Sequence, residues 1–197
     1  MLDFETAVGP TSDRQGTPSR GSSRRRIRTF LPVVIVFGAL FLSLSAKLFV
    51  WPAQNALQGT HADAIVVLGG PGPRWQVAVE LAEEHAAPVM LVSVASTRWN
   101  CPGTDLAGVK IECFRPDPFS TMGEARFAAS QARANGWHSL IVVSSTPQAT
   151  RARLRVKRCF DGSVYVVTAR PRLRDWPGEV IYEWGALIKA LAWQTSC

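Results

Sequence analysis

The stretch from Asp63 to Arg74 places the strongest limit on the fold of this chain. It begins with the apolar run Ala64–Leu68, which is rich in β-branched residues and predicts a strand buried on both faces of a sheet. Glycines follow, and they let the backbone turn sharply and approach a ligand closely. Pro73 suits the first turn of a helix, and Arg74 adds a cation beside the free N–H groups of that turn. The stretch therefore predicts a strand, a turn and a helix start that bind an anion.

A long apolar run over residues 30–51 predicts a membrane anchor. Its 22 residues contain one charge, Lys47, and as an α-helix they would extend about 33 Å, enough to cross a bilayer core. Pro32 falls in the first turn of this predicted helix, and Trp51 suits the membrane interface. The run predicts one transmembrane helix.

The residues on either side of this run predict its orientation. Residues 1–29 are polar and end in an arginine cluster, which predicts a disordered basic tail in the cytoplasm. Residues 53–197 would then form an extracytoplasmic domain on a single-pass plasma-membrane protein. A cleavable signal peptide is the alternative, since small residues lie near Ser45, but the apolar run continues past any such cleavage point.

The positive charge of the chain is spread between the tail and the domain. The formal net charge is +7, of which residues 1–29 carry +3 and residues 52–197 another +3. The domain is therefore only mildly basic, and nucleic acid is not a predicted partner.

All four cysteines follow the predicted anchor, as expected for an oxidising compartment. Cys101 and Cys113 flank a short loop and are the predicted disulfide. Cys159 and Cys197 form either a second disulfide or two free thiols. The chain has no C-x-x-C spacing and its histidines are scattered, so no metal site is predicted.

Strands and helices alternate through the predicted domain. This order predicts a three-layer α/β fold with a mostly parallel sheet of five strands, covered by helices through right-handed crossovers. In the last helix, six apolar residues share one predicted face: Val180, Ile181, Trp184, Leu187, Ile188 and Leu191. The predicted strands are 63–68, 88–93, 109–114, 139–144 and 163–168; the predicted helices are 74–85, 122–135, 147–158 and 177–193; and residues 95–107 are a predicted loop.

Polar residues follow the predicted strands, where ligands bind in open α/β sheets. Arg74 and Arg151 are predicted to clamp a phosphate, and Glu124 is the candidate acid or base. The other basic residues around 153–158 fit a solvated helix face or, with Arg170, Arg172 and Arg174, contact with anionic lipid. The candidate ligand-binding residues are Gly69, Gly70, Arg74, Ser93, Thr121, Ser145, Gln148 and Arg151.

Several of these polar residues also have a structural interpretation. Thr121 and Glu124 have the spacing of a capping box, and Thr146 fits the N-cap of the next helix. Asp63, at the start of its strand, is predicted to be structural. Glu183 in the last helix is predicted to be a solvent-facing charge.

These segments, in this order, resemble the YdcF/SanA/ElyC-like envelope family across residues 62–190. The resemblance implies a Rossmann-like α/β fold behind a membrane anchor, and roles in envelope or peptidoglycan biogenesis around polyprenyl-phosphate carriers. One branch is associated with S-adenosylmethionine. Gln148 stands where the family usually has a histidine, and Ala125 where it often has an asparagine. The matching segments are 63–70, Arg74 with Ala78, 88–93, 121–125, and 141–145 with Arg151–Ala152, while 112–118 resembles an actinobacterial-type branch.

The leading hypothesis is therefore an anchored envelope protein that binds an anionic, phosphate-bearing ligand such as a lipid-linked precursor. No cofactor is predicted. One alternative is an S-adenosylmethionine or nucleotide-binding module. Another is a non-catalytic interaction module, which Gln148 favours because it removes the expected general base.

Overall fold

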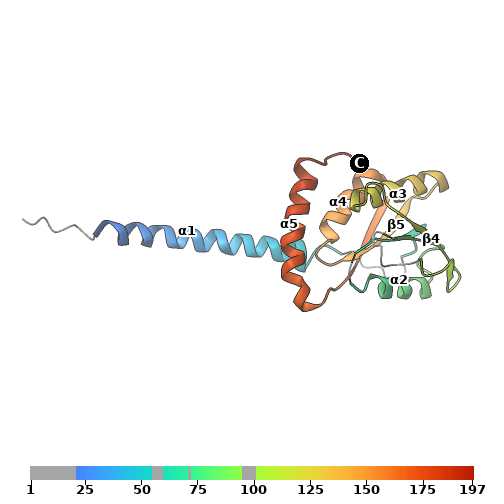
Figure 1. Ribbon diagram of the computed structural model, residues 1–197, viewed down its shortest axis with the longest axis horizontal. Coiled ribbons are helices and arrows are strands. Elements are labelled where there is room, and N and C mark those ends of the chain that lie inside the picture. The colour runs from blue at the N-terminus through green and yellow to red at the C-terminus, as the bar shows by residue number, and fades with distance from the viewer. Residues whose placement is uncertain (1–20, 55–59, 71, 95–100) are drawn as a thin grey trace, which may run out of the picture. The chain divides into compact units, whose positions relative to one another are not determined.

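The computed structural model describes residues 21–54, 60–70, 72–94 and 101–197, which form parts of two compact units, Met1–Phe41 and Leu42–Cys197. The predicted disordered tail up to residue 20, Pro71 of the glycine turn and the start of the predicted loop at 95–107 lie outside these ranges. Figure 1 shows the elements in order.

The N-terminal apolar run forms α1, Gly21–Ser45, which continues as the short helix η1, Ala46–Val50. Residues Pro32–Val50 are long and apolar enough to cross a membrane, as an anchor or as a signal sequence would be. The helix begins earlier than the predicted residue 30, because arginine is a good helix former. Pro32 consequently lies inside α1, and its predicted place in the first turn is wrong.

Six strands form one sheet in the order β3-β4-β2-β1-β5-β6. Five of them are parallel, as predicted, and β3 pairs antiparallel with β4. Residues of β3 were predicted to belong to the loop 95–107, and this prediction is wrong for them. The strand is short and joins β4 through the tight turn Ala107–Gly108, in which both residues have positive φ. The strands are β1 Ala64–Val67, β2 Val89–Ser93, β3 Asp105–Leu106, β4 Val109–Phe114, β5 Ser139–Ser145 and β6 Ser163–Ala169.

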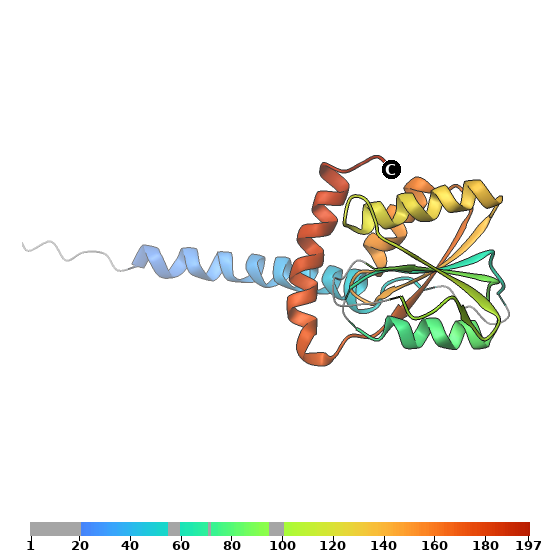
Figure 2. The ribbon, with the colours of Figure 1, turned by 45° about the vertical axis from the view of Figure 1, so that its right-hand side comes forward.

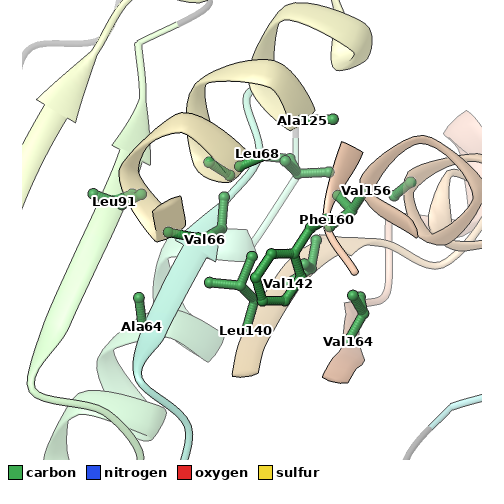
Figure 3. Packing of buried hydrophobic residues seen from close by; sticks show 14 of the residues in the cluster. Ala64, Val66, Leu68, Leu91, Ala125, Leu140, Val142, Val156, Phe160 and Val164 are labelled. Atoms are coloured by element: carbon green, nitrogen blue, oxygen red, sulfur yellow. The ribbon is translucent and has the colours of Figure 1, made fainter. Parts of the chain in front are cut away.

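Helices cover both faces of the sheet, with α2 on one face and α3 and α4 on the other (Figure 2). Successive residues of β1 point to opposite faces, so Val66 joins the core under α3 and α4 while Ile65 joins the core under α2. Figure 3 shows Val66, Val142 and Phe160 packed in the first of these cores. The helices are α2 Arg74–Glu83, α3 Thr121–Asn135, α4 Ala149–Cys159, η2 Leu173–Asp175 and α5 Trp176–Ala192.

The last helix, α5, covers neither face of the sheet. It lies at one end of the sheet, outside the two helical layers (Figures 1 and 2). Of its predicted apolar face, Leu187 is buried, Val180 and Trp184 are half-buried, and Ile181, Ile188 and Leu191 are exposed. The predicted face is therefore only partly buried, because the buried side chains of α5, which are Glu183, Leu187 and Ala190, lie on a stripe that shares only Leu187 with it.

Two predicted helix caps are also wrong. The N-cap of α3 is Ser120, and Thr121 is already the first helical residue, so no capping box forms. The helix α4 begins at Ala149, and the Thr146 hydroxyl instead donates to the Ala169 carbonyl. Gly136 ends α3 in the left-handed conformation that glycine favours at a helix C-terminus.

Two disulfides close the domain, and both lie in the unit Leu42–Cys197. Cys101 pairs with Cys113, as predicted, and Cys159 pairs with Cys197. At the amino end of the sheet, the Asp63 carboxylate accepts bonds from the backbone N–H groups of His138 and Ser139. Asp63 is therefore structural, as predicted.

Candidate functional site

A cavity of about 450 Å³ opens at the carboxyl ends of β1 and β5. Strands β2 and β4 follow β1 to one side of the sheet, while β5 and β6 extend to the other, so the strand order reverses between β1 and β5. In open α/β sheets the crevice at such a reversal is the usual ligand site. The cavity is lined by Gly69, Gly70, Arg74, Phe119, Ser120, Thr121, Glu124, Ser145, Gln148, Arg151, Gly178, Glu179, Tyr182 and Glu183.

The structure brings nearly all of the sequence-predicted site residues to this cavity. The exception among them is Ser93, which ends β2 and is buried behind Glu124 rather than in the cavity wall. Its hydroxyl lies close enough to Glu124 to counteract part of the rise in the pKa of that carboxyl, although the distance and angle between them do not make a hydrogen bond. Ser93 therefore shapes the environment of Glu124 and does not face a ligand.

Arg74 is a buried cation without an ion pair among the described residues. Its guanidinium donates to the Gly69 carbonyl at 3.0 Å and to Gln148 Oε1 at 2.9 Å, and its Nε has no partner within the described part of the chain. Burial lowers the pKa of Arg74, and the nearby charges of Glu124 and Glu179 offset only part of that effect. Since arginine stays protonated in proteins, this side chain is a positive charge whose hydrogen-bonding capacity is not used up.

The glycine turn fits closely around this arginine. Gly70 has φ +123°, and a Cβ on it would lie 2.5 Å from Arg74 Nη1. Gly72 also has positive φ, but a Cβ there would meet nothing within 4 Å. Gly70 therefore suits the turn, and a larger residue there would have to displace the end of the Arg74 side chain.

Glu124 lies buried on the first turn of α3 and faces the turn after β1. Its Oε1 accepts the backbone N–H of Gly69 at 2.6 Å, a bond across the site rather than the return bond of a capping box. Burial raises the pKa of Glu124, although Ser93, Gly69 and Arg74 counteract this rise. A buried carboxyl with a raised pKa beside a cavity is a candidate proton donor or acceptor.

Gln148 connects the two arginines through a buried chain of hydrogen bonds. Its Oε1 accepts from Arg74 and from the Ser144 hydroxyl, and its Nε2 donates to the Thr121 hydroxyl at 2.9 Å. Thr121 also accepts from Arg151 Nη1 at 2.9 Å. Gln148 holds the floor of the cavity together in one orientation, and an amide provides no basic nitrogen.

Arg151 is neutralised within the protein. Its Nε and Nη2 each bind one carboxylate oxygen of Glu183 at 2.7 Å, and both side chains are buried. Burial acts to lower the pKa of Arg151, but Glu183 raises it above its ordinary value. The prediction that Glu183 faces solvent is therefore wrong, because this part of α5 lies against the cavity.

Sequence reasoning missed the contribution of α5 to the site. Glu179 and Glu183 are one helical turn apart and line the cavity together with Tyr182. Burial raises the pKa of Glu179, and the Ser145 hydroxyl acts in the opposite direction. The available signal was a pair of acids at i, i+4 in an otherwise apolar helix, a spacing that places both on one face.

A second hollow of about 1090 Å³ lies next to the first and shares Gly178 and Glu179 with it. Arg170, Arg172 and Arg174 line it together with Asp175 and Glu179, and Arg174 pairs with Asp175 at 3.5 Å. No group of three metal-ligating side chains that could hold an ion occurs within the described ranges. The site therefore offers one uncompensated buried cation, one carboxyl with a raised pKa and an arginine-lined approach.

Comparison with protein-family models, with curated proteins and with solved structures found no match for this chain.

Proposed function

We propose that this chain is a membrane-anchored envelope protein of the YdcF/SanA/ElyC-like kind, whose cavity binds the phosphate of a lipid-linked ligand. The observation that carries the proposal is Arg74, a buried guanidinium at the strand-order reversal that has no ion pair and a free Nε among the described residues. A buried charge is costly unless it is paired, so an anionic ligand group would stabilise this arrangement. The resemblance in the sequence points to the same ligand class.

The proposed phosphate lies between Arg74 and the amino end of α2. This helix begins at Arg74, so its first backbone N–H groups lack helical partners and favour negative charge. Arg151 is already bound to Glu183 and serves to position Thr121 and Gln148. The proposed two-arginine clamp is thus reduced to a single phosphate-binding arginine.

If the protein is an enzyme, transfer or hydrolysis at the phosphate is the reaction class that this site supports. Glu124 is the proposed proton carrier, because it is buried, has a raised pKa and lies within the same cavity as Arg74. Gln148 cannot act as a base.

Binding to the intact protein tests this proposal. Full-length protein in detergent is titrated calorimetrically with a short-chain polyprenyl phosphate and, separately, with inorganic phosphate. We expect Arg74→Gln to weaken polyprenyl-phosphate binding by roughly tenfold or more, the effect of losing one charge-assisted hydrogen bond. Arg133→Gln, on the exposed end of α3, is the matched control. Equal affinity of wild type and Arg74→Gln would refute the proposal, and binding of inorganic phosphate alone would refute the lipid-linked ligand.

A nucleotide or S-adenosylmethionine module is the second candidate. The strand order and the glycine turn at its reversal favour it, since they resemble the Rossmann-like arrangement in which such cofactors bind. This candidate predicts a higher melting temperature in the presence of S-adenosylmethionine or ATP, whereas a lipid-phosphate site predicts no change.

A non-catalytic interaction module is the third candidate. The bonds of Gln148 to Arg74, Ser144 and Thr121 favour it, because they give this residue a purely structural role. A Glu124→Ala strain with a wild-type phenotype, beside loss of function on domain deletion, would support this candidate.

The proposed location places the tail in the cytoplasm and residues 53–197 outside. The two disulfides and the apolar helix support an extracytoplasmic domain, anchored or secreted. A reporter that is active only outside the cytoplasm, fused after Cys197, should give a signal. An inactive reporter on a protein that is expressed would refute this placement.

A further inference from the structure

The outward-facing side of α5 is apolar, and no described residue covers it. Its centre consists of Ile181, Gly185, Ile188 and Ala192, which recur at helical spacing; we call these four residues the outer stripe. Ile181 is 74% exposed and Ile188 is 50% exposed. A surface helix in water carries charged or polar residues on such a face. The three charged residues of α5 lie elsewhere: Glu179 and Glu183 line the cavity, and Lys189 lies beside the stripe.

The flank of this stripe contacts the end of the membrane-spanning candidate. Trp184 donates from Nε1 to the Ser45 hydroxyl at 3.1 Å, and its ring lies edge-on to Phe49 with centroids 5.2 Å apart. Both partners belong to the last turns of Pro32–Val50. The Thr150 hydroxyl donates to the Leu48 carbonyl at 2.6 Å, so the same turns are also fixed to α4. The outer stripe is therefore held where the chain would leave the bilayer.

We propose that the outer stripe of α5 lies in the headgroup layer of the membrane that the N-terminal helix crosses. This proposal rests on the proposed anchor. The occupant is lipid rather than protein, because Trp184, beside the stripe, contacts Ser45 and Phe49 in the last turns of the spanning candidate and because the ends of the stripe carry the residues of a membrane interface.

Those end residues combine cations with large apolar side chains. Before α5, Leu173 is 89% exposed and lies between Arg172 and Arg174. After it, Trp193 is 76% exposed, close in sequence to Lys189. Arginine and lysine bind lipid phosphates, while leucine and tryptophan enter the boundary between headgroups and acyl chains.

Docking of α5 has a consequence for the cavity. Residues of this helix, including Glu179, Tyr182 and Glu183, form one wall of the cavity, while the outer stripe faces the opposite way. With the stripe in the headgroup layer, the cavity and its arginine-lined approach open beside the membrane surface. A lipid-linked phosphate would then reach Arg74 without leaving the bilayer.

Spin labelling of the full-length protein tests the docking directly. Single variants Ile181→Cys, Ile188→Cys and Ala134→Cys are labelled with a nitroxide in nanodiscs of phosphatidylglycerol and phosphatidylcholine, after mass spectrometry has shown that the N-terminal helix is present. Ala134 is an exposed residue on α3 and serves as the control. We expect a several-fold higher ratio of oxygen to nickel-chelate accessibility at positions 181 and 188 than at 134.

Equal ratios at all three positions would refute the docking. Low accessibility to both reagents, together with dipolar coupling between labels of two molecules, would refute contact with lipid and show that a second copy of the chain covers the outer stripe. If a labelled variant does not fold, photo-crosslinking of the wild-type protein with a diazirine-bearing phosphatidylglycerol gives the same answer, with adducts expected on residues 176–193. None of these measurements requires a bound ligand, so their failure is separate from failure of the proposed phosphate site.

Discussion

Arg151 on α4 and Glu183 on α5 form a buried ion pair in which two guanidinium nitrogens each bind one carboxylate oxygen at 2.7 Å. The pair joins α5, which packs on neither face of the sheet, to the domain beside the candidate site. It therefore fixes one wall of the cavity.

Loss of one partner of this pair should destabilise the protein strongly. Glu183→Ala leaves the buried Arg151 charge unpaired, and we expect the free energy of unfolding to fall by about 3–5 kcal/mol. The exposed pair of Lys110 and Glu112 is the control, and Lys110→Ala should cost less than about 1 kcal/mol. Urea unfolding followed by circular dichroism measures both. Similar losses in the two variants would mean that the Arg151–Glu183 pair is not effectively buried.

Substitution of Gly70 should weaken ligand binding more than substitution of Gly72. Both glycines have positive φ, so each alanine variant carries backbone strain of about 1–3 kcal/mol. Only at Gly70 does the added Cβ collide with Arg74 Nη1. Calorimetric titration with polyprenyl phosphate should therefore show weakened binding for Gly70→Ala and near-normal affinity for Gly72→Ala. Equal effects on affinity would show that strain in the turn, rather than the position of Arg74, controls binding.

The raised pKa of Glu124 predicts a specific pH dependence of stability. Below the ordinary glutamate pKa, the carboxyl is protonated in both the folded and the unfolded state and costs nothing. As the pH rises, the unfolded state loses its proton first, so wild type loses stability until the pH exceeds the raised folded-state pKa. Glu124→Gln cannot ionise and should lack this loss.

Urea unfolding of wild type and Glu124→Gln across acidic to neutral pH measures the difference. The stability of the variant relative to wild type should increase with pH over this window and then become constant. A relative stability that decreases with pH would mean that the folded-state pKa of Glu124 is lowered rather than raised.

Removal of the disulfide near the C-terminus should cost more than removal of the other one. In the chain-entropy model, closing the loop between Cys159 and Cys197, 38 residues apart, is worth about 4 kcal/mol, against about 3 kcal/mol for the 12-residue separation of Cys101 and Cys113. The disulfide between Cys159 and Cys197 also holds the segment after α5, where Arg158 donates to the Gln194 carbonyl. Thermal melting of the two double-serine variants compares them, and a lower melting temperature for the variant at 101 and 113 would contradict this order.

Local sequence patterns predicted the sheet and the edge where the candidate site lies. The run from Ala64 to Leu68 is apolar at every position, and in the structure its residues are buried on both faces of the sheet. The positions of polar residues after successive strands placed the candidate site residues at one edge, since carboxyl ends of parallel strands meet there. The strand β3 was missed because two residues carry no detectable period.

Which polar side chains pair with each other at the candidate site depends on the position of α5. Its sequence is apolar on nearly every side, so periodicity alone predicted a buried face against the sheet and left Glu183 exposed. In the structure α5 crosses the end of the sheet instead, which buries Glu183 against Arg151 and leaves Ile181 74% exposed.

The sequence by itself determined the apolar N-terminal helix, the parallel α/β domain and the disulfide between Cys101 and Cys113, because these follow from residue patterns over short distances. Only the tertiary structure decided that Arg151 is paired and Arg74 is not. Ion pairing is a property of groups brought within about 4 Å of each other, and Arg151 meets its partner 32 residues later in the chain, on a helix whose position no local pattern specifies.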